Sequence, residues 1–186
     1  MKKATFCDRC DICIHNNFLP LWGIGDENAD IIIIHESPTK RERRLTSIYD
    51  GKKYTLLARL LYAYNFNLDN CYFTHAIKCA TPKGREPSLN ELRHCTVHLI
   101  EELQTVKPKI IVLLGATLLK HFYSDQAMSL YKEHGKARII GKFVIVPTFS
   151  PSFINQNPKM LRHVVNDWEL IYNYYKVLHP NHFKNI

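Results

Sequence analysis

The sequence contains no apolar run long enough to cross a membrane. A membrane-spanning helix needs roughly 18 consecutive apolar residues, and no run in the chain approaches that length. The opening residues, MKKATFCDRC, also lack the apolar stretch of a secretory signal. Both absences argue against a membrane-bound or secreted protein. We therefore expect a soluble, cytoplasmic protein that has no membrane partner.

Internal repeats, low-complexity segments and a recognisable interdomain linker are absent as well. The chain has 186 residues, of which 46% are hydrophobic, and this is enough to bury one good core. We expect a single domain over residues 1–186, acting as a monomer.

Acidic residues are scarce relative to basic ones. The chain has 25 Lys and Arg but only 17 Asp and Glu, which gives a formal net charge of +8 and a pI near 9.2. A basic protein favours polyanionic partners such as nucleic acid over acidic ones. The alternative is that the charge serves solubility alone.

Short apolar runs alternate with amphipathic segments. The β-branched and apolar runs predict buried strands at 29–36, 70–77, 108–116 and within 137–149, the last as part of a hairpin. Helices are predicted at 52–64, after the capping box of Ser88 and Glu91, at 117–123 and near 161–171. This alternation predicts an α/β fold of three layers, with a mostly parallel central sheet flanked by helices.

In such a sheet, ligands bind at the carboxyl ends of the strands. Four segments with polar or turn-forming residues stand at these predicted ends: HESPT (35–39), THAIKC (74–79), LGAT (114–117) and TFSPSF (148–153). We expect them to meet at one edge of the sheet and to form the functional site.

Six cysteines in a reducing compartment suggest metal ligands, reactive groups or small core residues rather than disulfides. Cys7 and Cys10 form a C-x-x-C pair, and Cys79 and Cys95 flank a Pro- and Gly-containing loop. The two pairs could together bind zinc or an iron–sulfur cluster through four thiolates. Cys13 is a rival ligand, because Cys10 and Cys13 have the same spacing.

The order of these motifs resembles that of the iron–sulfur uracil-DNA glycosylases, the family-four branch of the uracil glycosylase superfamily. The matching segments are the C-x-x-C pair, GIG (23–25), HESPT, IYDG (48–51), HAIKCATP (75–82), Arg85, Pro87, Cys95, LGAT and TFSPSF. The resemblance covers nearly the whole chain. It implies that Cys7, Cys10, Cys79 and Cys95 ligate a structural [4Fe–4S] cluster, which would pin the loop between the last two.

The resemblance also implies hydrolysis of the bond between uracil and deoxyribose in DNA. Glu36 matches a glutamate that would stabilise the sugar cation or position water, and Ser37 and Pro38 would line the base pocket. Tyr49 stands for the aromatic residue that stacks on uracil.

Of the departures from the family pattern, two are the most serious. His75 replaces an asparagine that reads the edge of uracil, and an imidazole presents its donor and acceptor on opposite sides of the ring. Ser150 replaces a histidine that would favour the anionic leaving base. We assign catalysis to Glu36 and Ser150, and base binding to Ser37, Pro38, Tyr49 and His75.

Basic residues near these loops are the predicted contacts to the DNA backbone. The run KRERR follows HESPT directly, and further candidates lie in the two later loops. The predicted contacts are Lys40, Arg41, Arg44, Lys78, Lys83, Arg85 and Ser152.

Three functions remain open at this point. The first is an active glycosylase on uracil or a related modified pyrimidine in DNA. The second is a catalytically impaired DNA-binding relative. The third is a metal-stabilised α/β protein whose cleft binds a small nucleotide. Base release, binding without release, and salt-independent mononucleotide binding would distinguish them.

Overall fold

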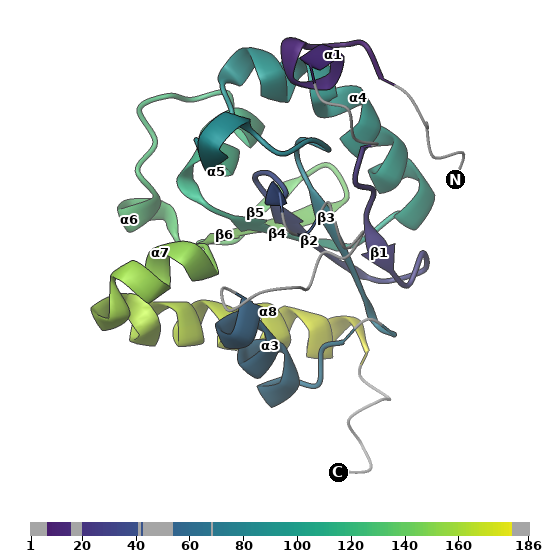
Figure 1. Ribbon diagram of the computed structural model, residues 1–186. Helices are drawn as coiled ribbons and strands as arrows, with labels where there is room; N and C mark the ends of the chain where they lie inside the picture. Colours follow the sequence, from purple (N-terminus) through teal and green to yellow (C-terminus); the bar gives the residue numbers. More distant parts are fainter. Residues whose placement is uncertain (1–6, 16–19, 41, 43–53, 68, 180–186) are drawn as a thin grey trace.

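A computed structural model describes residues 7–15, 20–40, 42, 54–67 and 69–179 (Figure 1). One six-stranded sheet forms its centre, in the order β1-β3-β2-β4-β6-β5. The four inner strands run parallel to one another, and the edge strands β1 and β5 are antiparallel to β3 and β6. The strands are β1 (Ile24–Gly25), β2 (Ile31–His35), β3 (Cys71–His75), β4 (Ile110–Leu114), β5 (Arg138–Ile140) and β6 (Phe143–Thr148).

Helices cover both faces of this sheet (Figure 1). One face carries α1 (Asp11–His15), α4 (Leu89–Val106) and α5 (Ala116–Phe122), and the other carries α3 (Tyr54–Ala63) and α8 (Leu161–Leu178). The short helices α6 (Leu130–Glu133) and α7 (Pro151–Gln156) lie toward one end of α8, and 3₁₀ turns span Pro82–Gly84 and Pro158–Met160. The molecule therefore has the three-layer α/β architecture that the sequence predicts.

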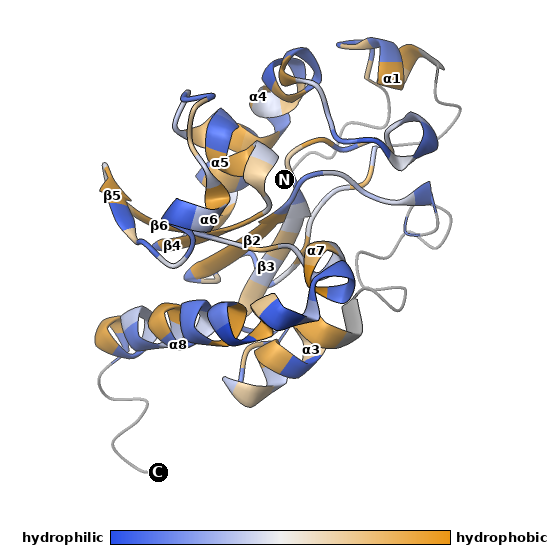
Figure 2. Ribbon diagram, turned by 90° about the vertical axis from the view of Figure 1, so that its left-hand side faces the viewer, coloured by the Kyte–Doolittle hydropathy of each residue, from blue (hydrophilic) through white to orange (hydrophobic). Residues whose placement is uncertain are grey.

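Successive side chains of each inner strand enter different cores. Ile31 and Ile33 pack in the core beneath α3 and α8, whereas Ile32 and Ile34 pack in the core beneath α4. A strand buried on both faces needs a continuous apolar run, and IIII supplies one. Figure 2 shows β2 and β4 as uniformly hydrophobic, while α8 alternates between polar and apolar residues along its length.

Several local predictions are confirmed. The side chain of Ser88 accepts a hydrogen bond from the Glu91 N–H, and the Glu91 carboxylate accepts one from the Ser88 N–H, so the capping box begins α4. The hairpin at 137–149 forms as β5 and β6, and it turns at Gly141, whose φ is +59°. None of the helices in the described ranges is long and apolar enough to span a membrane.

The register of the sheet places the four predicted segments at one edge. His75 pairs with His35, His35 pairs with Leu114, and Leu114 pairs with Thr148, so one row of residues ends the four parallel strands. The segments that follow this row emerge together, as the rule for ligand sites in parallel sheets requires.

Candidate active site

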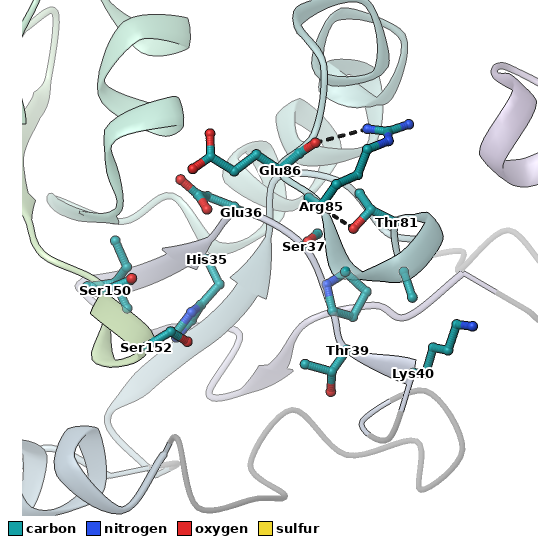
Figure 3. A pocket seen from close by; sticks show the side chains of 14 residues that line it. His35, Glu36, Ser37, Thr39, Lys40, Thr81, Arg85, Glu86, Ser150 and Ser152 are labelled. Carbon is teal, nitrogen blue, oxygen red and sulfur yellow. Dashed lines mark hydrogen bonds between the residues drawn. The ribbon is translucent and has the colours of Figure 1, made fainter. Parts of the chain in front are cut away.

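A cavity of about 300 Å³ opens where these strand ends meet (Figure 3). Three parts of the chain form its wall: the segment after β2, the loop that follows Cys79, and the N-terminus of α7. The polar side chains in the wall include His35, Glu36, Ser37, Lys40, Ser150 and Ser152. The structure thus brings together predicted site residues that lie more than one hundred positions apart in the sequence.

Glu36 is anchored at both its backbone and its side chain. Its carbonyl oxygen accepts a hydrogen bond of 3.1 Å from the Ile77 N–H, which ties the end of β2 to the segment after β3. Its Oε1 accepts a 3.2 Å hydrogen bond from the Thr117 N–H at the start of α5. The carboxylate is therefore held in place before any substrate binds.

The turn after Glu36 is fixed by a reciprocal pair of hydrogen bonds. The Thr39 N–H donates to Glu42 Oε2 at 2.6 Å, and the Glu42 N–H donates to Thr39 Oγ1 at 3.1 Å. Pro38 is buried beneath this turn, and Ser37 and Lys40 face the cavity. A preset turn keeps these side chains in one arrangement on the cavity wall.

The histidine that lines the cavity is His35, whereas the sequence predicts His75 in that role. His75 is fully buried and is not part of the wall, whereas His35 lines the cavity. The cavity lies over β2 and β4, and His75 belongs to β3, one strand away. The two imidazole centroids are 5.8 Å apart, and Glu42 Oε1 lies 3.6 Å from His75 Nε2. Sequence reasoning missed His35, although its position at a strand end was a usable signal.

Ser150 is the N-cap of α7. Its Oγ accepts a hydrogen bond of 3.3 Å from the Phe153 N–H, and Pro151 occupies the first helical position. Behind it, Thr148 Oγ1 donates to the buried carboxylate of Asp167 at 2.6 Å. Because one hydroxyl can both accept and donate, Ser150 can still donate its hydrogen to an atom in the cavity.

Arg85 is committed to its own loop. Its guanidinium donates to the Glu86 carbonyl at 2.9 Å (Figure 3). It also donates to Glu91 Oε2 at 2.8 Å. The hydrogen bond from Arg85 lowers the pKa of Glu91 to about 2. Arg85 thus holds the loop in shape, and a contact with DNA phosphate would compete with the Glu91 pair.

The remaining predicted DNA contacts fall into two groups. Lys40, Lys83 and Ser152 are exposed, and Lys40 and Ser152 also line the cavity. Arg41 and Arg44, with the predicted stacking residue Tyr49, lie outside the described residues.

The prediction that Lys78 contacts phosphate is wrong. Its side chain is 1% exposed, and its Nζ donates to Glu102 Oε2 at 2.5 Å, to Thr74 Oγ1 at 2.7 Å and to the His75 carbonyl at 2.7 Å. Glu102, also fully buried, accepts a further bond of 2.9 Å from the Gly23 N–H. The pair of Lys78 and Glu102 is an internal link between the segment after β3 and α4.

Cysteine sulfurs gather beside α1 and α4. Cys13 Sγ lies 3.7 Å from Cys10 Sγ and 3.6 Å from Cys79 Sγ, and it is also hydrogen-bonded to Cys7. Burial and the neighbouring Cys79 raise the pKa of the Cys13 thiol well above its ordinary value. All four thiols are free of disulfides.

Cys95 completes the group from α4. Its Sγ accepts a hydrogen bond of 3.3 Å from the Lys78 N–H. Burial raises its pKa to about 12, with smaller upward contributions from Cys79 and Cys10. In the described ranges no three His, Cys, Asp or Glu side chains are arranged to hold a single metal ion. The donor set is instead several converging thiols, the chemistry that iron–sulfur clusters use.

Comparison with known proteins identifies the family. The sequence profile described as the uracil DNA glycosylase superfamily matches residues 22–171. This range includes all six strands of the sheet and the buried residues of α8, the last of which is Ile171. The chain belongs to the uracil DNA glycosylase superfamily.

Two type-4 uracil-DNA glycosylases match this chain over most of their own length, and a DNA polymerase matches it over a small part of its length. A type-4 uracil-DNA glycosylase of Thermotoga maritima is 28% identical over 91% of this chain and 88% of its own. One of Archaeoglobus fulgidus is 25% identical over 92% and 89%. A DNA polymerase of Bacillus phage SP01 is 28% identical over 82% of this chain, but the match covers only 16% of the polymerase.

Proposed function

We propose that this protein is a DNA glycosylase that hydrolyses the N-glycosidic bond of uracil in DNA, as in base excision repair. The observation that carries the proposal is the placement of Glu36, which is anchored by Thr117 at the cavity where all four parallel strands end. The type-4 uracil-DNA glycosylases to which the chain is similar, and its net charge of +8, support a DNA substrate.

The target base must leave the helical stack and enter the cavity before its bond can break. Positive charge then develops on the sugar and negative charge on the base. The Glu36 carboxylate stabilises the sugar cation and orients the attacking water, and the Ser150 hydroxyl donates toward the base anion. Both groups are fixed beforehand by the hydrogen bonds to Thr117 and Phe153, so little reorganisation is needed during the reaction.

Base recognition involves Ser37, Pro38 and the two histidines. Because His35 lines the cavity, we assign the direct contact with the base to His35. His75, predicted from the sequence as a base-binding residue, supports His35 from the adjacent strand and is itself supported by Glu42. Tyr49 remains the predicted stacking residue.

The DNA backbone is expected to pass over the rim of this cavity. Lys40 and Ser152 line it, and Lys83 is exposed on the neighbouring loop. Arg41 and Arg44 continue the basic run that begins at Lys40 and stay predicted contacts.

The cysteine group fits a [4Fe–4S] cluster, which would serve as a structural crosslink between the N-terminal segment, the loop after β3 and α4. Cys79 and Cys95 would be two of the four ligands, whichever N-terminal pair supplies the other two. The sulfur contacts of Cys13 with Cys10 and Cys79 favour Cys10 and Cys13 as the second pair. Cys7, which the sequence paired with Cys10, also contacts His98 Nε2 at 3.4 Å and would lie beside the cluster.

A base-release assay tests the function. Iron-replete protein in excess is incubated with labelled DNA that carries one uracil, in single- and double-stranded form, and abasic sites are then cleaved with alkali. Thymine in place of uracil is the control substrate. We expect cleavage at uracil only. Binding to both DNAs without cleavage would instead favour the impaired DNA-binding relative.

A further inference from the structure

Two carboxylates of the cavity wall are held by one residue. The Thr117 N–H donates to Glu36 Oε1 at 3.2 Å, and the Thr117 hydroxyl donates to Glu86 Oε2, also at 3.2 Å. Figure 3 shows the side chains of Glu36 and Glu86 pointing toward the same side of the cavity. Glu86 lies in the loop before α4, fifty positions away in the sequence, so only the fold brings the two together.

The pair stands where two cavities meet. A second cavity, of about 370 Å³, lies between α5, the segment before α6 and α7. Glu36, Glu86 and Ser150 belong to the walls of both cavities. A sugar or water molecule at this junction would contact both carboxylates.

The backbone of Glu86 is fixed by its neighbours. Thr81 Oγ1 donates to the Arg85 carbonyl at 2.5 Å, Arg85 Nη1 donates to the Glu86 carbonyl at 2.9 Å, and Pro87 is buried. Arg85 directs its guanidinium to the carboxylate of Glu91 and not to that of Glu86. The negative charge of Glu86 is therefore presented to the cavity from a well-defined position.

We propose that Glu86 is a second catalytic carboxylate, which acts with Glu36 on the sugar cation and the attacking water. This inference rests on the proposed glycosylase function. The bond from C1′ to the base nitrogen breaks, and its electron pair leaves with the base. The water oxygen bonds to C1′, and its proton passes by way of a carboxylate to the departing base. Two negative charges stabilise the sugar cation more strongly than one.

The same two charges must also repel the DNA phosphates. The role of Glu86 in catalysis therefore predicts a specific split between rate and affinity. Removing its charge should slow the chemical step while DNA binding stays the same or becomes tighter. A residue that only maintained the loop would weaken both together.

The test uses Glu86→Gln, which keeps an acceptor for Thr117 and removes the charge. Single-turnover uracil release and binding to uracil-free DNA are measured beside the wild type. The control is Glu169→Gln, at an exposed position of α8. We expect uracil release by Glu86→Gln to be at least about a hundredfold slower, which is the lower end of general acid–base effects. Binding should be undiminished and the thermal midpoint unchanged.

Each other result decides against the inference. A Glu86→Gln rate equal to that of the Glu169→Gln control would overturn the catalytic role while leaving the glycosylase function intact. A slower rate with equally weakened binding and a lowered midpoint would reduce Glu86 to a loop residue. A wild type that releases no uracil would overturn the proposed function and this inference with it.

Discussion

Glu36 and Gly115 are in such close contact that a side chain at position 115 would have to displace the Glu36 carboxylate. A Cβ added there would lie 2.4 Å from Glu36 Oε1, and the φ angle of Gly115 is +122°, which residues with a side chain rarely adopt. The LGAT turn therefore contains glycine for two independent reasons, local backbone conformation and room for the carboxylate.

Gly115→Ala should consequently displace Glu36 and slow uracil release by about a hundredfold, the usual effect of misplacing a catalytic group by about 1 Å. Gly141→Ala is the matched control, because Gly141 also has a positive φ but has no atom near the added Cβ. Single-turnover rates of both variants check this. Equal rates for the two variants would show that crowding at Glu36 is unimportant.

Cys13→Ser and Cys7→Ser should differ in cluster content. We expect Cys13→Ser to lose iron and visible absorbance, since Cys13 contacts both Cys10 and Cys79. Cys7→Ser should keep both, because its thiol contacts His98 and Cys13, while Cys13 itself would be the fourth ligand. Iron and sulfide analysis of protein purified without oxygen measures the outcome. The reverse pattern would restore Cys7 as the ligand that the sequence alone suggested.

Lys78 and Glu102 should be strongly coupled in stability. Lys78→Met leaves a buried carboxylate without its cation, and such a change costs about 3–5 kcal/mol of unfolding free energy. Adding Glu102→Gln removes that charge, so the double variant should be less destabilised than the sum of the two single variants. Urea unfolding of all four proteins tests the coupling. Simple additivity would contradict it.

Asp167 should give the protein a pH-dependent stability. Burial raises its pKa above the ordinary 3.8, despite hydrogen bonds from Thr148 and His134. The folded state then binds this proton more tightly than the unfolded state, so stability declines as the pH rises from 3.8 through the folded pKa. The melting temperature of the wild type should fall relative to that of Asp167→Asn over this range. A difference that grew in favour of the wild type would contradict the assignment.

The fold was predictable because its signals are local. A few neighbouring residues are enough to predict each element. Examples are the apolar run of β2, the capping box that begins α4 at Ser88, and the glycine turn before β6. Strand order alone then decides which segments meet, and the carboxyl-end rule placed them correctly. The two-residue strand β1 was not predicted, because so short a segment has no periodicity to detect.

The site was predictable only in part, since several of its contacts depend on distant partners. The sequence around Lys78 is typical of an exposed loop lysine, and its buried partner Glu102 lies on α4, far away in the sequence. His75 and His35 are equivalent in the sheet register, and only the position of the cavity over β2 and β4 distinguishes them. Glu86 carried no signal, because its link to Glu36 runs through Thr117 on a third element.

The most direct test of the central claim is to measure the release of free uracil by mass spectrometry. Uracil-containing DNA is mixed with an excess of wild-type or Glu36→Gln protein, and DNA binding is measured in parallel. The account predicts that the wild type releases one uracil per DNA molecule. Glu36→Gln should bind the DNA at least as well but release uracil at least about a hundredfold more slowly. Equal release by the two proteins would contradict the assignment of Glu36 as the catalytic carboxylate.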